Sequence, residues 1–528
     1  MLVLLTLGGP LLAKLFGSTL VGMESHRIQV EVDVTNGIPG FEMVGLPDAA
    51  LRESRIRVKS AIKNSGFEWP KTKIHINLAP ADIKKEGPSF DLPIALGILQ
   101  AMGQLRPVRG TDFIAAGELS LDGQLRAVTG ALSIALGARA CCSECLIVPQ
   151  GNASEAALVQ GVDVYGVSSL RQAVAFLEGA HLEPVRVDPR DMLVEDPDDL
   201  ADLAEVRGQE PARRALEVAA AGGHNLLMVG PPGSGKTMLA RRLPGILPPL
   251  TVEEALEVTR IHSVAGMVPA GGSLIGDRPF RTPHNSISAV GLTGGGVPLP
   301  RPGEVSLAHC GVLYLDELTL YPRNALESLR VPLEDRQVTI VRSMVTVTYP
   351  ARFSMIASMN PCPCGYLGDP QHECACSVTD ILRYRSKISG PLLDRIDIQI
   401  EVPRLTRAQL MDREGGEPSA EVRARVVSSR RVQESRFEGS GVFSNSAMTN
   451  SMLDAHCRTS AEGERFLGLA VERLGLSARS YHRVLKVART IADLANSERV
   501  EVEHLAEAVQ YRCLEREALS AGALAIKR

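Results

Sequence analysis

The sequence predicts an α/β protein of about three domains. Its 528 residues match three cores of roughly 100–200 residues each, and 45% apolar with 22% charged residues excludes a disordered or collagen-like chain. Strand and helix signals alternate early, a glycine-rich phosphate loop opens a second α/β unit, and the last part looks helical. We expect domains at 1–187, 188–403 and 404–528, with an acidic, proline-bearing linker at 181–205.

Local periodicity supports the elements of the first domain. Residues 28–34 and 73–78 alternate between apolar and polar side chains, which is typical of half-buried strands. Residues 53–64 have helical spacing, and residues 91–102 form a mostly apolar helix. The first domain is therefore expected to be a sheet covered by helices.

Charge and cysteine content limit the classes of function. The chain carries 57 basic and 61 acidic residues, a net charge of −4, so it is not a basic protein that coats nucleic acid. Any contact with DNA must use a local surface such as a ring pore. Ten cysteines in so long a chain indicate a reduced, cytoplasmic protein with room for one metal site, not a disulfide scaffold.

The first 16 residues are apolar, but they lack a basic start and are too short to cross a bilayer. A buried first strand, an upstream start codon and a cleaved signal peptide are the alternatives. No other segment reaches about 18 uncharged apolar residues, so we expect no membrane partner.

The strongest motif is a phosphate loop, which follows the strand-like residues 225–229 and precedes the helical residues 238–243. Glycines let backbone N–H groups surround the phosphates of ATP. Lys236 is expected to reach the β- and γ-phosphates, and the Thr237 hydroxyl to hold Mg²⁺. The loop consists of Gly230, Pro231, Pro232, Gly233, Ser234, Gly235, Lys236 and Thr237.

Two later strands supply the groups that hydrolysis needs. Residues 311–315 are an apolar strand that ends in Asp316 and Glu317. Asp316 would bind in the Mg²⁺ shell, and Glu317 would orient and activate the attacking water. A further strand, 353–359, ends in Asn360, which is suited to position that water from a neighbouring strand.

Arginines near the end of the second unit and in the C-terminal part are candidates for sensing ATP. Arg395 follows a proline-started segment and is either a structural ion-pair residue or an arginine finger that reaches the ATP of an adjacent subunit. Arg479 begins a helix and is suited to contact the γ-phosphate of its own chain. Arg483, one turn later, is the alternative.

Two Cys-x-Cys pairs flank a nine-residue loop and can supply four thiolates to a tetrahedral zinc ion. Zinc sites more often use Cys-x₂-Cys, so free thiols or a redox pair are the alternatives, and His372 is a substitute ligand. The candidate ligands are Cys362, Cys364, Cys374 and Cys376. A second group, Cys141, Cys142 and Cys145, lies on an apolar stretch and is expected in the core.

Two segments are candidates for gripping DNA. Residues 337–347 contain two β-rich runs around Arg342, which predicts a hairpin with an arginine at its tip. Residues 265–303 are rich in glycine and proline and carry Arg278, Arg281, His284 and Arg301. The alternative for both segments is a solvated loop. No helix-turn-helix pattern is present, so we expect no sequence-specific recognition.

Together these motifs resemble the YifB/ComM family of magnesium-chelatase-like AAA+ ATPases, from about residue 13 to 515. One departure is His284-Asn285, where the family usually has two histidines. The stretches that carry the resemblance are VGLPDAALRESRIRVKSAI, NLAPADIKKEGPSFDLPIALGIL, GPPGSGKT, RPFRTPHNSIS, GEVSLAHCGVLYLDEL, MNPCPCG, GPLLDRIDI and LSARSYHRVLKVARTIADL.

The resemblance implies a hexameric ATPase with a Lon-protease-like (S5-type) N-terminal domain, an AAA+ core with pore-loop insertions and a helical C-terminal lid. ComM-type members are implicated in branch migration of DNA during natural transformation, so DNA is the implied partner.

Ser89 stands where the Lon-type domain has its nucleophile, but the matching region, 117–123 continuing to 131–134, contains no lysine, and none occurs between Lys85 and Lys236. We therefore expect no protease activity, and we expect Ser89 to cap the helix that begins near Asp91.

Three candidate functions fit these sequence features to different degrees. A DNA translocase or branch-migration helicase fits the pore-loop candidates, and a protein-remodelling or regulatory ATPase fits an N-terminal domain that binds a partner. A metal-chelatase motor subunit fits less well, because the chain has a fused N-terminal domain and no acidic, proline-rich linker to an integrin-like domain. DNA-dependent ATP turnover would separate the first two.

Overall fold

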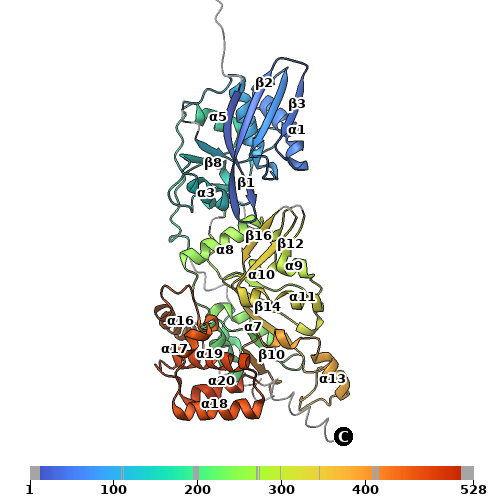
Figure 1. The fold of residues 1–528 in the computed structure, drawn as a ribbon, viewed down its shortest axis with the longest axis vertical. Coiled ribbons are helices and arrows are strands. Elements are labelled where there is room, and N and C mark those ends of the chain that lie inside the picture. Colours follow the sequence, from blue (N-terminus) through green and yellow to red (C-terminus); the bar gives the residue numbers. More distant parts are fainter. Residues whose placement is uncertain are drawn as a thin grey trace, which may run out of the picture.

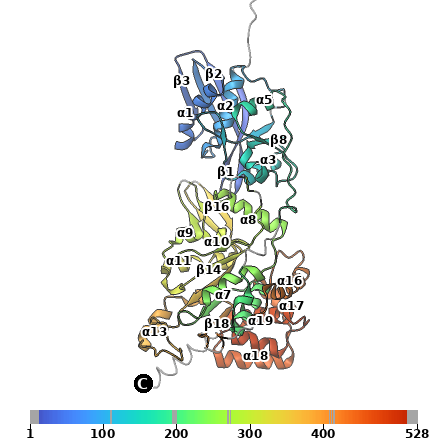
Figure 2. The ribbon, with the colours of Figure 1, turned by 180° about the vertical axis from the view of Figure 1, so that it is seen from behind.

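The computed structural model describes residues 12–108, 110, 112–193, 201–268, 271–272, 274–297, 299–343, 345–406, 409, 411 and 415–512. The described chain is elongated, with three parts stacked along its long axis (Figure 1). The N-terminal sheet lies at one end, a second sheet with its helices lies in the middle, and the C-terminal helices pack beside and beyond it (Figure 2).

The N-terminal part is a seven-stranded mixed sheet in the order β3-β4-β2-β1-β5-β8-β9. Its strands are β1 (Leu12–Val21), β2 (Glu24–Thr35), β3 (Gly40–Val44), β4 (Lys73–Ala79), β5 (Phe113–Ala115), β8 (Cys145–Pro149) and β9 (Asp163–Val167). A small hairpin, β6 (Glu118–Leu119) and β7 (Leu125–Arg126), lies beside it. The helices are α1 (Ala49–Asn64), α2 (Asp91–Ala101), α3 (Ala131–Ala140), α4 (Gln150–Ala156) and α5 (Leu170–Leu177).

The alternation predicted for residues 28–34 is seen in β2, where Ile28, Val30 and Val32 are buried. The helix predicted for residues 91–102 is α2, which is buried along nearly its whole length. The N-cap residue of α2 is Phe90, and no side chain caps this helix. The expectation that Ser89 caps it is therefore wrong. Ser89 lies in a short 3₁₀ turn, and its carbonyl accepts from the Gly117 N–H at 2.9 Å.

The middle part is a five-stranded parallel sheet in the order β11-β14-β17-β10-β18. Its strands are β10 (Leu226–Val229), β11 (Phe280–Arg281), β14 (Val312–Leu315), β17 (Ser354–Met359) and β18 (Ile398–Glu401). The helices are α6 (Glu210–Gly222), α7 (Lys236–Arg242), α8 (Val252–Val264), α9 (Ala289–Thr293), α10 (Glu304–Leu307), α11 (Arg323–Ser328), α12 (Pro332–Asp335), α13 (Val378–Arg385) and α14 (Gly390–Leu393). Because β10, β14 and β17 are parallel neighbours, the segments that follow them meet at one edge of the sheet.

Two hairpins project from this core. They are formed by β12 (Gly294–Gly295) with β13 (Arg301–Pro302), and by β15 (Gln337–Val341) with β16 (Thr346–Pro350). The second confirms the hairpin predicted around Arg342.

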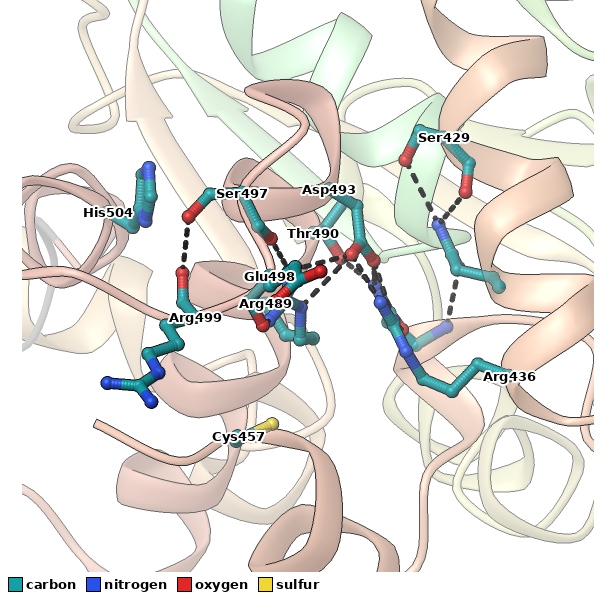
Figure 3. Close-up of polar contacts among 12 residues, drawn as sticks. Ser429, Arg436, Cys457, Arg489, Thr490, Asp493, Ser497, Glu498, Arg499 and His504 are labelled. Atoms are coloured by element: carbon teal, nitrogen blue, oxygen red, sulfur yellow. Dashed lines mark hydrogen bonds and ion pairs between the residues drawn. The ribbon is translucent and has the colours of Figure 1, made fainter.

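The C-terminal part consists of α16 (Ser419–Arg436), α17 (Asn450–His456), α18 (Ala461–Leu474), α19 (Ala478–Leu494) and α20 (Val502–Gln510). A buried carboxylate, Asp493 on α19, links this helix to α16 and to the segment around Asn445 (Figure 3). It accepts two hydrogen bonds from Arg436, at 2.8 and 2.5 Å, and one from Asn445 at 2.8 Å. Arg489, one turn earlier on α19, pairs with the same carboxylate at 2.9 Å. A buried charge that is matched this fully strongly favours one packing arrangement of the helices.

The N-terminal part contacts the core through α8. Arg260 donates to the Met23 carbonyl at 2.6 Å and to the Ser133 hydroxyl at 3.2 Å. The Ser263 hydroxyl donates to Glu155, which lies in the N-terminal part. The β15–β16 hairpin also reaches the β1–β2 turn, since an added Cβ at Gly22 would meet Val347 at 2.2 Å.

Three further expectations concern the apolar start of the chain, the cysteines near residue 141 and membrane-spanning segments. Of the apolar start, the segment from Leu12 is β1, and the rest lies outside the described residues. Cys141 and Cys142 are exposed after α3, so their expected place in the core is wrong. Among the described helices, none is long and apolar enough to cross a membrane.

Candidate nucleotide site

The phosphate loop joins β10 to α7, as its sequence context predicts. Gly233 and Gly235 have φ angles of +76° and +91°, a left-handed backbone that glycine adopts without strain. The Lys236 ammonium donates to the carbonyls of Gly230 and Pro231 at 2.8 and 2.9 Å, so it lies over the loop where phosphates would bind. Burial lowers the pKa of Lys236, and the nearby Asp316 carboxylate opposes that shift.

The two expected Mg²⁺ ligands lie in contact. The Thr237 Oγ1 donates to the Asp316 carboxylate at 3.0 Å, and the Tyr314 hydroxyl donates to its other oxygen at 2.9 Å. Burial favours a higher pKa for Asp316, but hydrogen bonds from Ser358, Tyr314 and Thr237 outweigh it and lower the pKa. An ionised carboxylate beside a hydroxyl is a donor set that fits Mg²⁺.

Glu317 and Asn360 stand at the same edge. Glu317 is exposed in a left-handed conformation (φ +53°), and its N–H donates to the Asp316 carboxylate at 3.1 Å. Asn360 follows β17, between β10 and β14, and its Oδ1 lies 3.5 Å from the Lys236 ammonium. The structure therefore brings the loop lysine, the carboxylate pair and the asparagine together. Such a set can bind a nucleoside triphosphate and direct water at its last phosphate.

Sequence reasoning missed two residues that support the loop. Gln209, at the start of α6 with φ +55°, donates to the carbonyls of Ser234 at 3.3 Å and Pro403 at 2.7 Å. Arg404, just after β18, donates to the Pro232 carbonyl at 3.3 Å. Their partners are 25 to 194 residues away, so no local pattern marks them.

Arg395 is engaged within its own chain. Its Nε and Nη1 donate to the carbonyls of Arg330 and Pro391 at 3.0 and 2.7 Å, and Nη2 pairs with Glu334. Its relative exposure is 9%. This is the ion-pair alternative left open by the sequence, and the finger role stays a prediction.

Arg479 lies near the start of α19, beside a cavity at the edge of the core. Arg479 and Arg395 line one cavity of about 980 Å³, and none of its described lining residues belongs to the phosphate loop. Arg483, one turn after Arg479, pairs with Asp397 immediately before β18. That end of the parallel sheet is opposite to the end from which the phosphate loop emerges. The contact of Arg479 with a γ-phosphate stays a prediction.

Asp397 ties the C-terminal helices to this edge of the core. It pairs with Arg483 and, at 3.4 Å, with His224, whose other nitrogen contacts Thr490 of α19 at 2.8 Å. Burial works against ionisation of Asp397, but Arg483 and His224 lower its pKa far below the ordinary range.

The four cysteines predicted as metal ligands converge. Their sulfur atoms all lie within 4.8 Å of one another, and those of Cys362, Cys364 and Cys374 are 3.3 to 3.7 Å apart. The fourth is Cys376, whose sulfur accepts from the Cys364 N–H at 3.4 Å. His372 is instead stacked on Tyr366. Among the described cysteines, all nine are free thiols.

The DNA-contact candidates have different surroundings. Arg342 is exposed at the tip of the β15–β16 hairpin. This hairpin packs on the β12–β13 loop, since the Tyr349 hydroxyl donates to Pro300 at 2.7 Å and an added Cβ at Gly295 would lie 3.3 Å from the Arg342 Nη2. The two predicted loops thus form one surface.

Arg278 and Arg281 do not belong to that surface. The Arg278 guanidinium donates to the carbonyls of Pro248, Pro249 and Cys310 and pairs with Glu254 at 2.8 Å. Arg281 makes a two-pronged pair with Glu304 at 2.7 and 2.9 Å. In this structure their donors are occupied inside the chain, and DNA contact by these two arginines stays a prediction.

Ser89 has no base among its predicted partners. The Lys85 ammonium is buried and donates to the Pro80 carbonyl. The segment expected to supply a lysine has Ser133, which accepts a hydrogen bond from Arg260 of the core at 3.2 Å. Ser133 thus takes part in the contact between the N-terminal part and the core.

Three family models match separate parts of the chain. "Subunit ChlI of Mg-chelatase" matches residues 30–152, "Magnesium chelatase, subunit ChlI" matches residues 202–410, and "Magnesium chelatase, subunit ChlI C-terminal" matches residues 416–512.

Individual relatives match over nearly the full length. YifB of Salmonella typhimurium is 43% identical over 500 residues, which cover 94% of this chain and 96% of the relative. The competence protein ComM of Haemophilus influenzae is 42% identical over 508 residues, covering 96% and 98%. Lon protease 2 of Bacillus subtilis is 33% identical over 148 residues, 25% of each chain. The chain therefore belongs to the YifB/ComM family of magnesium-chelatase-like AAA+ ATPases.

Proposed function

We propose that this protein hydrolyses ATP with Mg²⁺ and uses the energy to move along DNA as a ring of identical subunits. The observation that carries the hydrolysis step is the convergence of Lys236, Thr237, Asp316 and Asn360 at one edge of the parallel sheet. Glu317 is exposed beside Asp316, and its carboxylate would orient the attacking water.

The ring is supported by what lies at the opposite edge. Arg395 and Arg479 share a cavity there, away from the chain's own phosphate loop. In a head-to-tail ring, that surface faces the phosphate loop of the neighbouring subunit, and both arginines would contact its ATP. Six subunits are the number that the family implies.

DNA is the polymer along which we propose that the protein moves, and the exposed Arg342 supports DNA binding. With a net charge of −4, attraction to phosphate must be local. The two hairpins form a joint surface on which Arg342 and Arg301 are exposed. A chain related to a competence protein would use such a surface for branch migration during recombination or transformation.

A protein substrate is the second candidate, because the two hairpins and the neighbouring helix α9 expose apolar side chains. The exposures of Val290, Val297 and Val341 are 53%, 90% and 66%. Exposed apolar residues around a pore would grip an unfolded polypeptide, as a remodelling ATPase requires.

ATP turnover with and without single-stranded DNA tests the proposal, with Lys236→Ala as the inactive control. We expect stimulation by DNA and unwinding of fork and Holliday-type substrates. DNA-independent turnover together with stimulation by an unfolded protein would favour the second candidate. Absence of turnover under all conditions would overturn the ATPase assignment itself.

A further inference from the structure

The cysteine loop, residues 362–376, follows Asn360 in the sequence and contacts the phosphate loop at Pro232. It begins two residues after Asn360, whose side chain lies 3.5 Å from the Lys236 ammonium. Cys362 is fully buried at the start of this loop. A change in the loop is therefore transmitted over a very short distance to the group that would bind the phosphates.

The sulfur atoms have the spacing of a tetrahedral metal site. Four thiolates about 2.3 Å from a zinc ion have sulfur atoms about 3.8 Å apart. The observed separations are 3.3 Å for Cys362–Cys364, 3.7 Å for Cys362–Cys374 and 3.6 Å for Cys364–Cys374. Cys376 lies within 4.8 Å of the other three. All four come from one loop, so the site needs no other chain.

The loop packs directly on the phosphate loop. Gly365 has φ +86°, and an added Cβ there would lie 2.8 Å from the Pro232 ring. Arg404 forms a second link, because it donates to the Pro232 carbonyl at 3.3 Å and pairs with Asp369 at 3.6 Å. Pro232 is thus held from two sides by the cysteine loop and by an arginine bound to that loop.

We propose that Cys362, Cys364, Cys374 and Cys376 bind one zinc ion, and that the metal-held loop braces the phosphate loop through Pro232. Zinc is expected because four thiolates in a tetrahedral arrangement are its preferred structural ligands. The bracing role rests on the proposed ATP site, whereas zinc binding does not. Loss of the metal frees the loop, shifts Pro232 and weakens ATP binding.

Metal content of the purified full-length protein tests the first part. We expect about one zinc per chain. Cys362→Ser/Cys364→Ser should lose it, whereas the control Cys141→Ser/Cys142→Ser, at two exposed cysteines outside the loop, should keep it. Wild-type protein without zinc that takes none up from added Zn²⁺ overturns the proposal, as does equal zinc in both variants.

A matched glycine pair tests the bracing role without touching a ligand. Gly365→Ala places a methyl group against Pro232, whereas Gly368→Ala, with a similar φ of +81°, meets nothing within 4 Å. We expect both variants to keep zinc, and Gly365→Ala alone to bind ATP about tenfold more weakly or worse, because misplaced binding groups are costly. Equal ATP affinity in the two variants overturns the brace.

The two proposals fail in distinguishable ways. Lys236→Ala should lose ATP binding and keep its zinc. The described hydrogen bonds of the Lys236 ammonium go to Gly230, Pro231 and Asn360, and not to a cysteine. If wild-type protein binds no ATP, the proposed function and the brace both fail, while the zinc measurement still decides the metal site.

Discussion

Arg395 and Glu334 form an ion pair inside one chain, and this pair holds the arginine that a neighbouring ATP would need. Two backbone carbonyls occupy the remaining nitrogens of its guanidinium. An arginine fixed in this way is either purely structural or is preorganised and exchanges one partner when a second subunit docks. The two roles predict different behaviour in mixed assemblies.

Mixing Arg395→Ala subunits with Glu317→Gln subunits should restore ATP turnover that neither variant has alone. At some interfaces an intact Arg395 then faces a site with an intact Glu317. The measurement is the turnover rate against mixing ratio, with a maximum expected near equal amounts. A purely structural Arg395 gives no maximum, because each defect stays within its own subunit.

Glu334→Gln is the matched control for that experiment. It removes the charge that holds Arg395 but leaves the guanidinium and its carbonyl partners. If Arg395 is an arginine finger, Glu334→Gln should keep most of the ATP turnover. If the pair is structural, both Arg395→Ala and Glu334→Gln should lower the midpoint temperature of thermal unfolding.

Glu317→Gln should bind ATP with nearly wild-type affinity and hydrolyse it about 10²–10⁴ times more slowly, the usual contribution of a general base. The carboxylate is exposed, so its replacement by an amide should cost little stability. Fluorescent-nucleotide binding and single-turnover hydrolysis separate the two effects. Hydrolysis at the wild-type rate would remove Glu317 from the mechanism.

The buried Asp91 should make the free energy of unfolding of the N-terminal domain depend on pH. Burial raises the pKa of Asp91 to about 6, although its bonds to Arg57, at 2.6 and 3.0 Å, act against that shift. A carboxyl with a raised folded-state pKa contributes stability that is full below pH 3.8 and is lost as the pH rises through 6.

Asp91→Asn removes this titration. Between pH 4 and pH 7.5, the free energy of unfolding of the wild type should therefore fall relative to the variant, by up to about 3 kcal/mol. Urea unfolding of both proteins at the two pH values measures the difference. A difference that does not change with pH would show that Asp91 has an ordinary pKa in the folded protein.

Local patterns predicted the elements and the motif positions, because both depend on neighbours in the sequence. The strand β2, the helix α2 and the hairpin around Arg342 each follow from periodicity or composition. The convergence of Thr237 with Asp316 follows from a parallel sheet that joins their strands at one edge.

Side-chain pairing was not predictable in the same way. No local pattern in the sequence shows whether Arg278, Arg281 and Arg395 are free or paired, and each is paired with a carboxylate that lies 23 to 61 residues away. Which arginine stays free is decided by packing, and only the fold shows it. The pairing of Arg483 with Asp397 likewise depends on how the C-terminal helices dock on the core.

Arg342 is a candidate DNA contact whose side chain is exposed at the tip of the β15–β16 hairpin. Its side chain makes one hydrogen bond, to the Val341 carbonyl at 3.2 Å, so Arg342→Ala should leave folding and DNA-independent ATP turnover unchanged. Binding to single-stranded and fork DNA should weaken about equally for all sequences. The slope of log affinity against log salt should become shallower by about one unit for each lost phosphate contact.

The matched control is Arg186→Ala, at an arginine that is 81% exposed on the N-terminal domain, and it should change neither affinity nor slope. The comparison matters because removing any positive charge from a chain of net charge −4 raises its overall repulsion from DNA. Equal effects of the two variants would mean that affinity follows the global field and that the hairpin does not grip DNA. The exposed valines at 290, 297 and 341 would then be the remaining contact surface, and a polypeptide would be the substrate to test on it.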